Sequence, residues 1–239
     1  MKITWLHTDT AFPPVESALT EPDGLLAAGG DLSPARLLNG YRHGIFPWFS
    51  EGQPILWWSP SQRTVFDTGV MHVPRRLARW LRTCGWQIRA DTAFVDVVRA
   101  CAAPRRHERG TWITEDMLAA YGKLHALGHA HSVEVWDGGR LVGGIYGIAV
   151  GHMFFGESMF SSTTNGSKVA LLALCRAMRD WGWPLLDAQV ASDHLFTLGA
   201  REMPRAEFCG QVGALVRLPG RDGPWTGQFP AIVPADLGS

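Results

Sequence analysis

The sequence predicts an α+β fold with a mostly antiparallel sheet, and three observations lead to that prediction. Seven prolines crowd residues 1–61, where long periodic runs are few, which is typical of a small, loop-rich domain. Residues 62–239 carry clear helical and strand periodicity, which indicates a larger second domain. In that part helices precede a meander of strands, and a helix and one further strand follow, an order that favours a single parallel crossover.

The N-terminal part contains one well-signalled helix. Ser33 is a typical N-cap residue, and Pro34 suits the first helical position because its missing N–H needs no partner there. Gly44 is expected to end the helix.

The second part holds most of the regular structure. Four longer helices are expected, at residues 74–83, 92–102, 115–127 and 167–181. Four strands are expected, at residues 131–136, 141–149, 152–159 and 185–190. Thr114 is the N-cap of the third helix, and Asp137-Gly138-Gly139 is typical of a hairpin turn. Two short helices follow Ser192 and Pro204.

Composition limits the possible classes of function. The formal net charge is zero, so no global field attracts nucleic acid, and any polyanion must meet a local patch. Four cysteines far apart, without a C-x-x-C pair, argue against a zinc ribbon or a disulfide framework and favour a reducing cytosol. The longest apolar run, 143–155, is too short to span a membrane, and the N-terminus lacks a signal-peptide pattern, so we expect a soluble cytoplasmic protein.

The predicted strand LLDAQV carries two polar residues inside an apolar segment. Side chains alternate along a strand, so Asp187 and Gln189 are expected to share one face. Burying a carboxylate costs several kcal/mol, roughly, unless it is paired or hydrogen-bonded. A hydrogen bond that braces the sheet and a functional site both explain the pair.

A third polar residue ends the preceding strand. Glu157 lies in GESMF, and alternation places it on one face with Met153, Phe155 and Met159. A salt bridge to an arginine is the alternative explanation. Three polar groups at the ends of two neighbouring strands favour a pocket.

Several familiar site patterns are missing from the sequence. The nine histidines form no H-x-x-x-H or H-E-x-x-H pair, so no metal is expected. There is no G-x-S-x-G elbow, and no phosphate loop or R/Q-x-x-G-x-G/A loop for the pyrophosphate of acetyl-CoA. The N-terminus of the helix that begins near Ser167, with Lys168, is a weak candidate anion site, and His194 is either a base or a capping residue.

Aromatic and basic residues leave two interpretations open. Most of the eleven tryptophans should be core residues, but Trp48 in GIFPWFS is expected to be exposed and could stack on a base. Arg75, Arg79 and Arg82 share one helix face, which is either a solvated surface or a contact for nucleic-acid phosphates. Further arginines follow at positions 105, 106 and 109.

Five long blocks of the sequence, within residues 10–208, strongly resemble the bacterial leucyl/phenylalanyl-tRNA–protein transferases. They are EPDGLLAAGGDLSPARLL, GYRHGIFPWFSEGQPILWWSP, GTWITEDMLAAYGKLHALGHAHSVEVW, GGIYGIAVGHMFFGESMFS and LLDAQVASDHLFTLGARE. Two positions depart from the family pattern: Ser162 stands where Arg is usual, and Ser192 where Asn is usual.

The resemblance implies a fold, an activity and its partners. The fold is a small N-terminal α/β domain, here 1–61, and a larger N-acetyltransferase-like (GNAT-like) domain, here 62–239. The activity moves Leu or Phe from the acceptor end of leucyl- or phenylalanyl-tRNA to the α-amine of proteins with N-terminal Arg or Lys. This marks them for N-degron proteolysis. No cofactor, metal or membrane is involved.

The resemblance also implies the site residues. Asp187 and Gln189 are the catalytic pair. The substrate-binding residues are Glu157, Ser158, Met159, Trp48, Trp112, Tyr121 and Tyr41. Met153, Phe155, Met159 and Leu174 are the expected walls for the Leu or Phe side chain. Two alternatives from other classes remain: a CoA-dependent acetyltransferase and a non-catalytic module that binds RNA or degrons.

Overall fold

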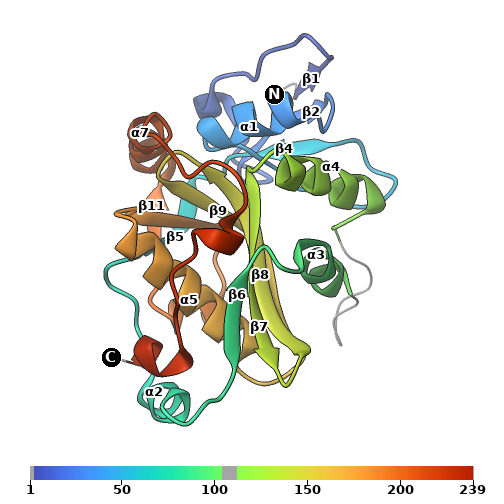
Figure 1. The fold of residues 1–239 in the computed structure, drawn as a ribbon. Helices are drawn as coiled ribbons and strands as arrows, with labels where there is room; N and C mark the ends of the chain where they lie inside the picture. Colours follow the sequence, from blue (N-terminus) through green and yellow to red (C-terminus); the bar gives the residue numbers. More distant parts are fainter. Residues whose placement is uncertain (1–2, 104–111, 239) are drawn as a thin grey trace.

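The computed structural model describes residues 3–103 and 112–238, and it contains two β-sheets with helices packed around them (Figure 1). The smaller sheet lies at the N-terminal end of the molecule, and the larger sheet runs through its centre (Figure 1). The prediction of a mixed fold with a mostly antiparallel sheet is confirmed.

The smaller sheet has four strands in the order β1-β2-β4-β3. Their bounds are β1 Thr4–Leu6, β2 Leu25–Gly29, β3 Phe46–Pro47 and β4 Leu56–Trp58. Helix α1, Pro34–Arg42, connects β2 to β3, and the Ser33 side chain accepts a hydrogen bond from the Arg36 N–H as its N-cap. The predicted helix and its cap are therefore confirmed.

The larger sheet has seven strands in the order β11-β5-β10-β9-β8-β7-β6. Their bounds are β5 Gln62–Asp67, β6 Gln87–Ala90, β7 Ala130–Asp137, β8 Arg140–Val150, β9 Met153–Ser161, β10 Leu185–Gln189 and β11 Arg201–Pro204. The β7–β8 and β8–β9 pairs are antiparallel, and β9 pairs with β10 in parallel. The predicted meander and its single parallel crossover are confirmed. The sequence did not predict the strands β5, β6 and β11.

Helices cover both faces of the larger sheet (Figure 1). Their bounds are α2 Arg75–Leu81, α3 Phe94–Ala102, α4 Glu115–Ala126, α5 Gly166–Asp180, α6 Asp193–Phe196 and α7 Arg205–Leu215. Short 3₁₀ helices are η1 Val15–Ser17, η2 Trp225–Gly227 and η3 Pro234–Gly238. Helix α5 is the crossover between β9 and β10, and ten of its residues are buried.

The two parts of the chain share one buried core. The small sheet ends at Trp58 and the large sheet begins at Gln62. A single apolar cluster nevertheless contains Tyr41 and Trp57 from the first part and Phe155 from the second. The Tyr41 and Phe155 rings lie 5.3 Å apart. The division into domains 1–61 and 62–239 stays a prediction.

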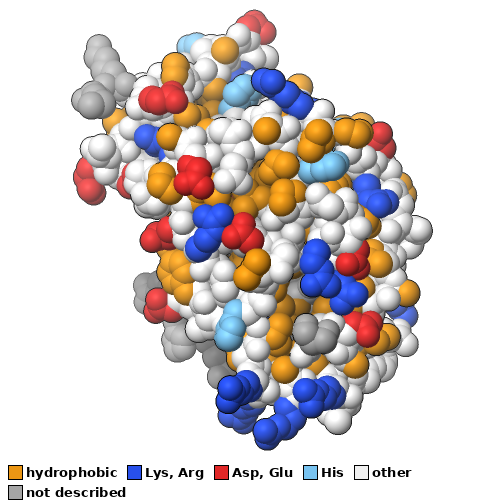
Figure 2. Space-filling model, turned by 90° about the vertical axis from the view of Figure 1, so that its left-hand side faces the viewer, with side chains coloured by type: hydrophobic (Ala, Val, Ile, Leu, Met, Phe, Trp, Pro, Cys, Tyr) orange, Lys and Arg blue, Asp and Glu red, His pale blue; other side chains and the backbone are white. Residues whose placement is uncertain are grey.

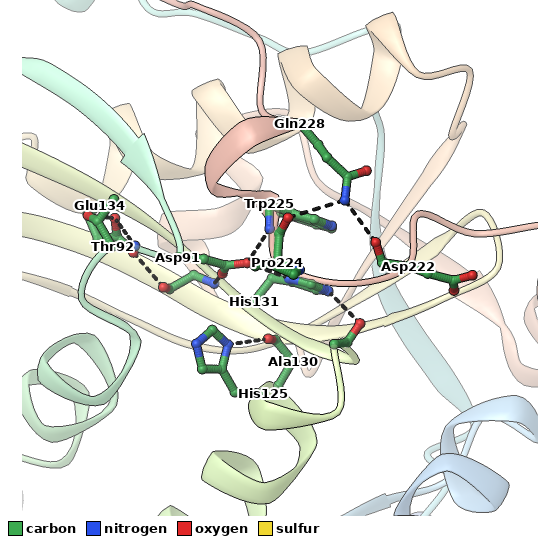
Figure 3. Close-up of polar contacts among 12 residues, drawn as sticks. Asp91, Thr92, His125, Ala130, His131, Glu134, Asp222, Pro224, Trp225 and Gln228 are labelled. Carbon is green, nitrogen blue, oxygen red and sulfur yellow. Dashed lines mark hydrogen bonds and ion pairs between the residues drawn. The ribbon is translucent and has the colours of Figure 1, made fainter.

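A buried polar cluster holds the C-terminal segment against the edge of the large sheet that β6 forms (Figure 3). The Asp91 carboxylate accepts the Trp225 backbone N–H at 2.6 Å and lies 2.8 Å from His131 Nδ1. The His131 and Trp225 rings stack with centroids 4.0 Å apart. His131 is fully buried, so this cluster belongs to the core of the fold.

No helix in the described part of the chain is both long and apolar enough to cross a membrane. The four cysteines, all of which lie in described residues, form no disulfide.

Two glycines allow α5 to begin directly against β8. A Cβ on Gly166 would lie 2.3 Å from the Val142 carbonyl oxygen, and a Cβ on Gly143 would lie 2.3 Å from the Gly166 carbonyl carbon. Backbone cannot yield to such an overlap as a flexible side chain can, so Gly166→Ala should lower the free energy of unfolding by about 1–3 kcal/mol.

Urea unfolding of both purified proteins measures this loss. The control is Gly210→Ala, since Gly210 lies inside α7 with nothing within 4 Å of its added Cβ. There, helix propensity alone should leave stability unchanged or raise it by about 0.5–1 kcal/mol. Equal effects at the two glycines would contradict the close contact of α5 with β8.

Candidate active site

A pocket of about 590 Å³ lies where the parallel strands β9 and β10 separate. Their pairing stops at Asp187 and Phe155, although β9 continues to Ser161. Both strands are irregular just beyond that level. The register of β10 on β5 shifts between Asp187 and Gln189, and Glu157 is skipped in the pairing of β9 with β8. Bulges of this kind bend strands and redirect side chains, and they are frequent beside active sites.

The pocket wall is mostly apolar, with a few polar groups on one side. Apolar lining side chains are Phe46, Pro47, Trp48, Phe66, Trp112, Ile145, Met159, Leu171, Leu186, Ala188, Val190 and Leu195. Polar lining side chains are Glu157, Ser158, Ser167, Gln189, Ser192 and His194. This combination suits a ligand with an apolar body and a polar or cationic end.

Gln189 reaches the pocket because of the bulge. Its φ of +64° is a left-handed backbone conformation, which a residue other than glycine rarely adopts. The bulge places Gln189 on the pocket wall together with Ala188 and Leu186, whereas Asp187 is absent from that wall. Both side chains nevertheless turn toward the same apolar cluster, since Arg63, the partner of Asp187, stacks on Phe46, and Glu157, the partner of Gln189, accepts from Tyr41.

Asp187 lies behind the pocket wall, fully buried, in an ion pair with Arg63. Arg63 Nε and Nη2 donate to the two carboxylate oxygens at 2.8 and 2.7 Å. The Gln189 backbone N–H also donates to Asp187 Oδ1 at 2.8 Å. The sequence did not indicate Arg63 as the partner of Asp187, because its one local signal is a basic residue two positions before the apolar pair Val65 and Phe66 in QRTVFD.

Glu157 lies on the pocket wall and accepts three hydrogen bonds. Tyr41 Oη and Gln189 Nε2 donate to Oε1 at 2.7 and 2.8 Å, and Tyr121 Oη donates to Oε2 at 2.5 Å. Burial raises the pKa of Glu157 to about 7, against the lowering effect of these donors and with a further rise from the Asp187 charge. A carboxyl group that titrates near neutrality can take up or release a proton in this pocket. Among the described residues no arginine forms a salt bridge with Glu157, whose partners there are two tyrosines and an amide.

Tyr41 and Tyr121 donate hydrogen bonds to Glu157, and neither exposes a ring face to the pocket. Both are fully buried, and their hydroxyl oxygens lie 3.0 Å apart. Burial, followed by the Glu157 charge, raises the pKa of each phenol well above its usual range, so both stay neutral hydrogen-bond donors. Both side chains are fully buried in this structure, so their predicted role in substrate binding stays a prediction.

The remaining predicted substrate-binding residues lie on the pocket wall. Ser158, Met159, Trp48 and Trp112 all line it. Trp48 is 44% exposed, which confirms its predicted exposure, and Trp112 is half-buried. Of the expected apolar walls only Met159 lines the pocket. Met153, Phe155 and Leu174 are fully buried in the core. Met159 follows the residue that is skipped at Glu157, and it packs on the apolar cluster opposite that of Met153 and Phe155.

Three further predictions have clear outcomes in the structure. His194 lines the pocket, and burial, with the Lys168 charge, lowers its pKa. Ser192 caps α6 by accepting the Leu195 N–H, and the Ser162 hydroxyl donates to the Leu141 carbonyl. Among the described residues no group of His, Cys, Asp and Glu is arranged to hold a metal ion.

The predicted basic helix is α2, with Arg82 as its C-cap residue. The side chains of Arg75, Arg76, Arg79 and Arg82 are exposed. On the face that Figure 2 shows, Lys and Arg side chains gather at the end of the molecule where α2 lies, opposite the N-terminal sheet. Arg105, Arg106 and Arg109 lie outside the described residues.

Comparison with protein families gives two matches that together cover most of the chain. The model described as "Leucyl/phenylalanyl-tRNA protein transferase" matches residues 65–213, and "Leucyl/phenylalanyl-tRNA protein transferase N-terminal domain" matches residues 30–61. Curated relatives carry the same name. A Xanthomonas campestris pv. campestris (strain B100) protein is 60% identical over 91% of this chain and 88% of its own length. A Thiobacillus denitrificans protein is 55% identical over 90% of this chain and 94% of its own.

Solved structures are much less similar. L-PGS from Bacillus licheniformis aligns with a TM-score of 0.40 and 10% identity over 70% of this chain and 53% of that one. A functionally unknown conserved protein from Staphylococcus epidermidis aligns with a TM-score of 0.40 and 9% identity over 75% and 68%.

The raised pKa of Glu157 predicts a pH-dependent effect of Glu157→Gln on stability. The folded-state pKa of about 7 exceeds the ordinary value of 4.5, so the ionised form destabilises the fold. The contribution of Glu157 is complete below about pH 4.5 and is lost as the pH rises through about 7. Glutamine does not ionise, so the stability of the variant relative to the parent should rise by about 2 kcal/mol between pH 5 and pH 8.

Urea unfolding of both proteins at the two pH values measures this difference in the free energy of unfolding. All other titrating groups are the same in the two proteins, so their contributions cancel. Glu202→Gln, on the exposed β11, is the control and should give the same difference at both pH values. A pH-independent difference for Glu157→Gln would show that its carboxyl titrates like an exposed one.

Proposed function

Because this chain belongs to the leucyl/phenylalanyl-tRNA–protein transferase family and is an aminoacyltransferase, we propose that the pocket between β9 and β10 is where the transfer occurs. The donor is leucyl- or phenylalanyl-tRNA, and the acceptor is the α-amine of a protein with N-terminal Arg or Lys. One observation carries the proposal: an apolar pocket of about 590 Å³ with a carboxyl group and an amide side by side on its wall.

The apolar wall suits the aminoacyl side chain. Phe66, Ile145, Leu171 and Leu186 line this part of the pocket and offer no hydrogen-bonding side chain. An apolar pocket separates side chains by only about 1–3 kcal/mol per methylene. Acceptance of both Leu and Phe follows from such a wall, as does rejection of charged side chains, which would lose their hydration.

Trp48 and Trp112 are the residues we assign to the 3′-terminal adenosine. Both line the pocket, and Trp48 keeps 44% of its surface exposed. The Trp58 Nε1–H donates to the Trp48 carbonyl at 2.6 Å and the two indole rings lie 5.8 Å apart, which holds the exposed ring in place. A base stacked on such a ring gains about 1–3 kcal/mol.

Glu157 is the group we assign to the cationic acceptor. The Asp187 charge is already matched by Arg63, so it is not available to attract an N-terminal Arg or Lys. Among the residues that line the pocket, Glu157 is the acidic one. Its anion would attract the acceptor cation, and that cation would in turn favour the ionised form of Glu157.

Gln189 is positioned to orient the amine. Its Nε2 donates to Glu157, and no hydrogen bond from a described residue occupies Oε1, which leaves the carbonyl free for the incoming amine. An α-amine has a pKa of about 7.7–8.0, so part of it is neutral near pH 7. The amine nitrogen forms the new bond to the ester carbonyl carbon, the ester C–O bond breaks, and the amine proton ends on the ribose oxygen.

The reaction needs no cofactor, because the aminoacyl ester is already activated and its aminolysis runs downhill. Placing the amine close to the ester is then the main task of the protein. We also propose that the larger sheet is of the N-acetyltransferase type, with the parallel pair β9–β10 at the site. A tRNA donor places the enzyme in the cytoplasm, where its products enter N-degron proteolysis.

Replacing Gln189 tests the assignment of the amide. Gln189→Leu keeps the bulk of the side chain but removes the acceptor carbonyl. We expect kcat to fall about 100-fold, as for a misplaced reactant, with aminoacyl-tRNA affinity unchanged. The assay follows labelled phenylalanine from phenylalanyl-tRNA to the N-terminus of a protein that begins with Arg.

Gln211→Leu, at a half-buried position of α7 that does not line the pocket, is the control and should transfer label at the parental rate. No label on the acceptor with the parental protein would refute the proposed function as a whole. Parental kcat in a folded Gln189→Leu variant would refute only the role of Gln189.

Replacing Trp48 tests the stacking assignment. Trp48→Ala should weaken aminoacyl-tRNA binding about 5- to 150-fold, which is the loss of one stacked base. Trp5→Ala is the matched control, since Trp5 is 56% exposed in the same small sheet but does not line the pocket. Filter binding of a non-hydrolysable aminoacyl-tRNA measures its dissociation constants for both variants and the parent. Equal constants for Trp48→Ala and the parent would exclude a base stacked on Trp48.

A further inference from the structure

Arg63 is the most completely engaged charged side chain beside the pocket. It lies on β5, and 1% of its surface is exposed. Besides its two hydrogen bonds to Asp187, its Nη1 donates to the Gly44 carbonyl at 3.0 Å. The guanidinium carbon lies 4.6 Å from the Phe46 ring centroid and 4.7 Å from that of Phe208. Three elements distant in sequence therefore hold this guanidinium: the end of α1 with β3, strand β10, and helix α7.

The ion pair continues directly into the bulge of β10. Asp187 Oδ1 accepts hydrogen bonds both from Arg63 Nε and from the Gln189 backbone N–H. Gln189 is one of three residues other than glycine with positive φ in the described part of the chain. Such a conformation persists only where the surroundings hold it in place. Here the hydrogen bond to Asp187 holds the backbone that turns the Gln189 side chain into the pocket.

We propose that Arg63 is a positioning residue for the transfer reaction. It fixes the Asp187 carboxylate, which fixes the backbone of Gln189, which in turn aims the Gln189 carbonyl at the incoming amine. In this arrangement Asp187 is also a positioning residue, because its two oxygens accept N–H groups of Arg63 and of the Gln189 backbone and it does not line the pocket. The inference rests on the function proposed above for the pocket.

Geometry distinguishes arginine from lysine at this position. A planar guanidinium can donate two parallel hydrogen bonds to a carboxylate, a third to a carbonyl, and stack between two rings, whereas an ammonium group is a point charge without that shape. Arg63→Lys therefore keeps the charge balance of the buried pair but loses control of carboxylate orientation. A misplacement of about 1 Å at a reacting group can cost about 100-fold in rate.

The experiment compares kcat and aminoacyl-tRNA binding for Arg63→Lys, Asp187→Asn and the double variant, all at a temperature where circular dichroism shows them folded. We expect each single variant to lower kcat about 30- to 100-fold with binding within about threefold of the parent. The double variant should lose no more than the worse single variant, because Arg63 acts through Asp187. The amide of Gln189 should exchange its hydrogen faster in all three.

Arg201→Lys is the matched control. Arg201 also binds an aspartate through two donors, joining β11 to Asp67 on the same strand β5, with distances of 2.8 and 3.2 Å. That pair is half-exposed and away from the pocket, so Arg201→Lys should leave kcat and Gln189 exchange unchanged. A structural role for Arg63 would lower thermal stability but leave kcat intact below the melting temperature.

Parental kcat in folded Arg63→Lys would overturn the inference, and so would losses that multiply in the double variant. If Arg63→Lys does not fold, the neutral Arg63→Gln/Asp187→Asn pair is compared with Asp187→Asn. Equal kcat in these two supports the inference, and a further loss in the double variant overturns it. Failure of the parental protein to transfer label would count against the proposed function and not against the positioning of Gln189, which hydrogen exchange reports independently.

Discussion

The ion pair between Arg63 and Asp187 is the interaction on which the geometry of the pocket depends. A carboxylate with no exposed surface is tolerated in a sheet only when its charge and its lone pairs are satisfied, and removing one partner of such a pair typically costs about 3–5 kcal/mol. Arg63 satisfies both needs at once and leaves Oδ1 able to accept the Gln189 N–H as well. The positive φ of Gln189, and therefore the direction of its side chain, follows from that last hydrogen bond. Because Arg63 also holds the Gly44 carbonyl, the end of α1 is fixed relative to the same point.

A second polar network, around Glu157, occupies the pocket side of the same bulge. When Glu157 is ionised, the hydroxyl protons of Tyr41 and Tyr121 both point to its oxygens, and no proton lies between the two phenols 3.0 Å apart. When Glu157 is protonated, its own proton can be donated to one phenol, whose proton then turns to the other. The network can therefore gain or lose one proton while its carbon, nitrogen and oxygen atoms stay in place. The high phenol pKa values keep this choice with the carboxyl group, whose pKa of about 7 makes both states accessible.

The sequence predicted elements whose signals are local and missed the contacts that join distant ones. Ser33, Thr114 and Ser192 were correctly predicted as helix caps, because the side chain of a cap and the N–H group that it accepts from lie within four residues of each other. The placement of Glu157 and Gln189 beside a pocket also follows from local pattern, since polar residues at the ends of buried strands need a reason. The bulges could not be predicted, because a bulge is defined by the partner strand and not by the strand that carries it. Arg63 lies 124 residues from Asp187, and neither segment carries a local pattern that indicates the other as its partner. Strand β5, which carries Arg63, was missed because QRTVFD lacks the alternation of apolar and polar residues that is typical of a strand.

Zero net charge does not conflict with a polyanionic donor, because screening makes binding depend on local charge. At physiological salt the Debye length is about 8 Å, so a charge on one end of the molecule is nearly invisible at the other. Helix α2 exposes four arginine side chains, counting Arg82 at its C-cap, and contains no acidic residue. If a tRNA places its phosphates there while its 3′ end reaches the pocket, the two contacts differ in kind. The first would be electrostatic and weaken with salt, and the second would depend on stacking and apolar burial and be largely indifferent to salt. Affinity for the tRNA body and selection of the aminoacyl group are then set by separate parts of the protein, so a neutral chain can bind tRNA without giving up an apolar, selective pocket.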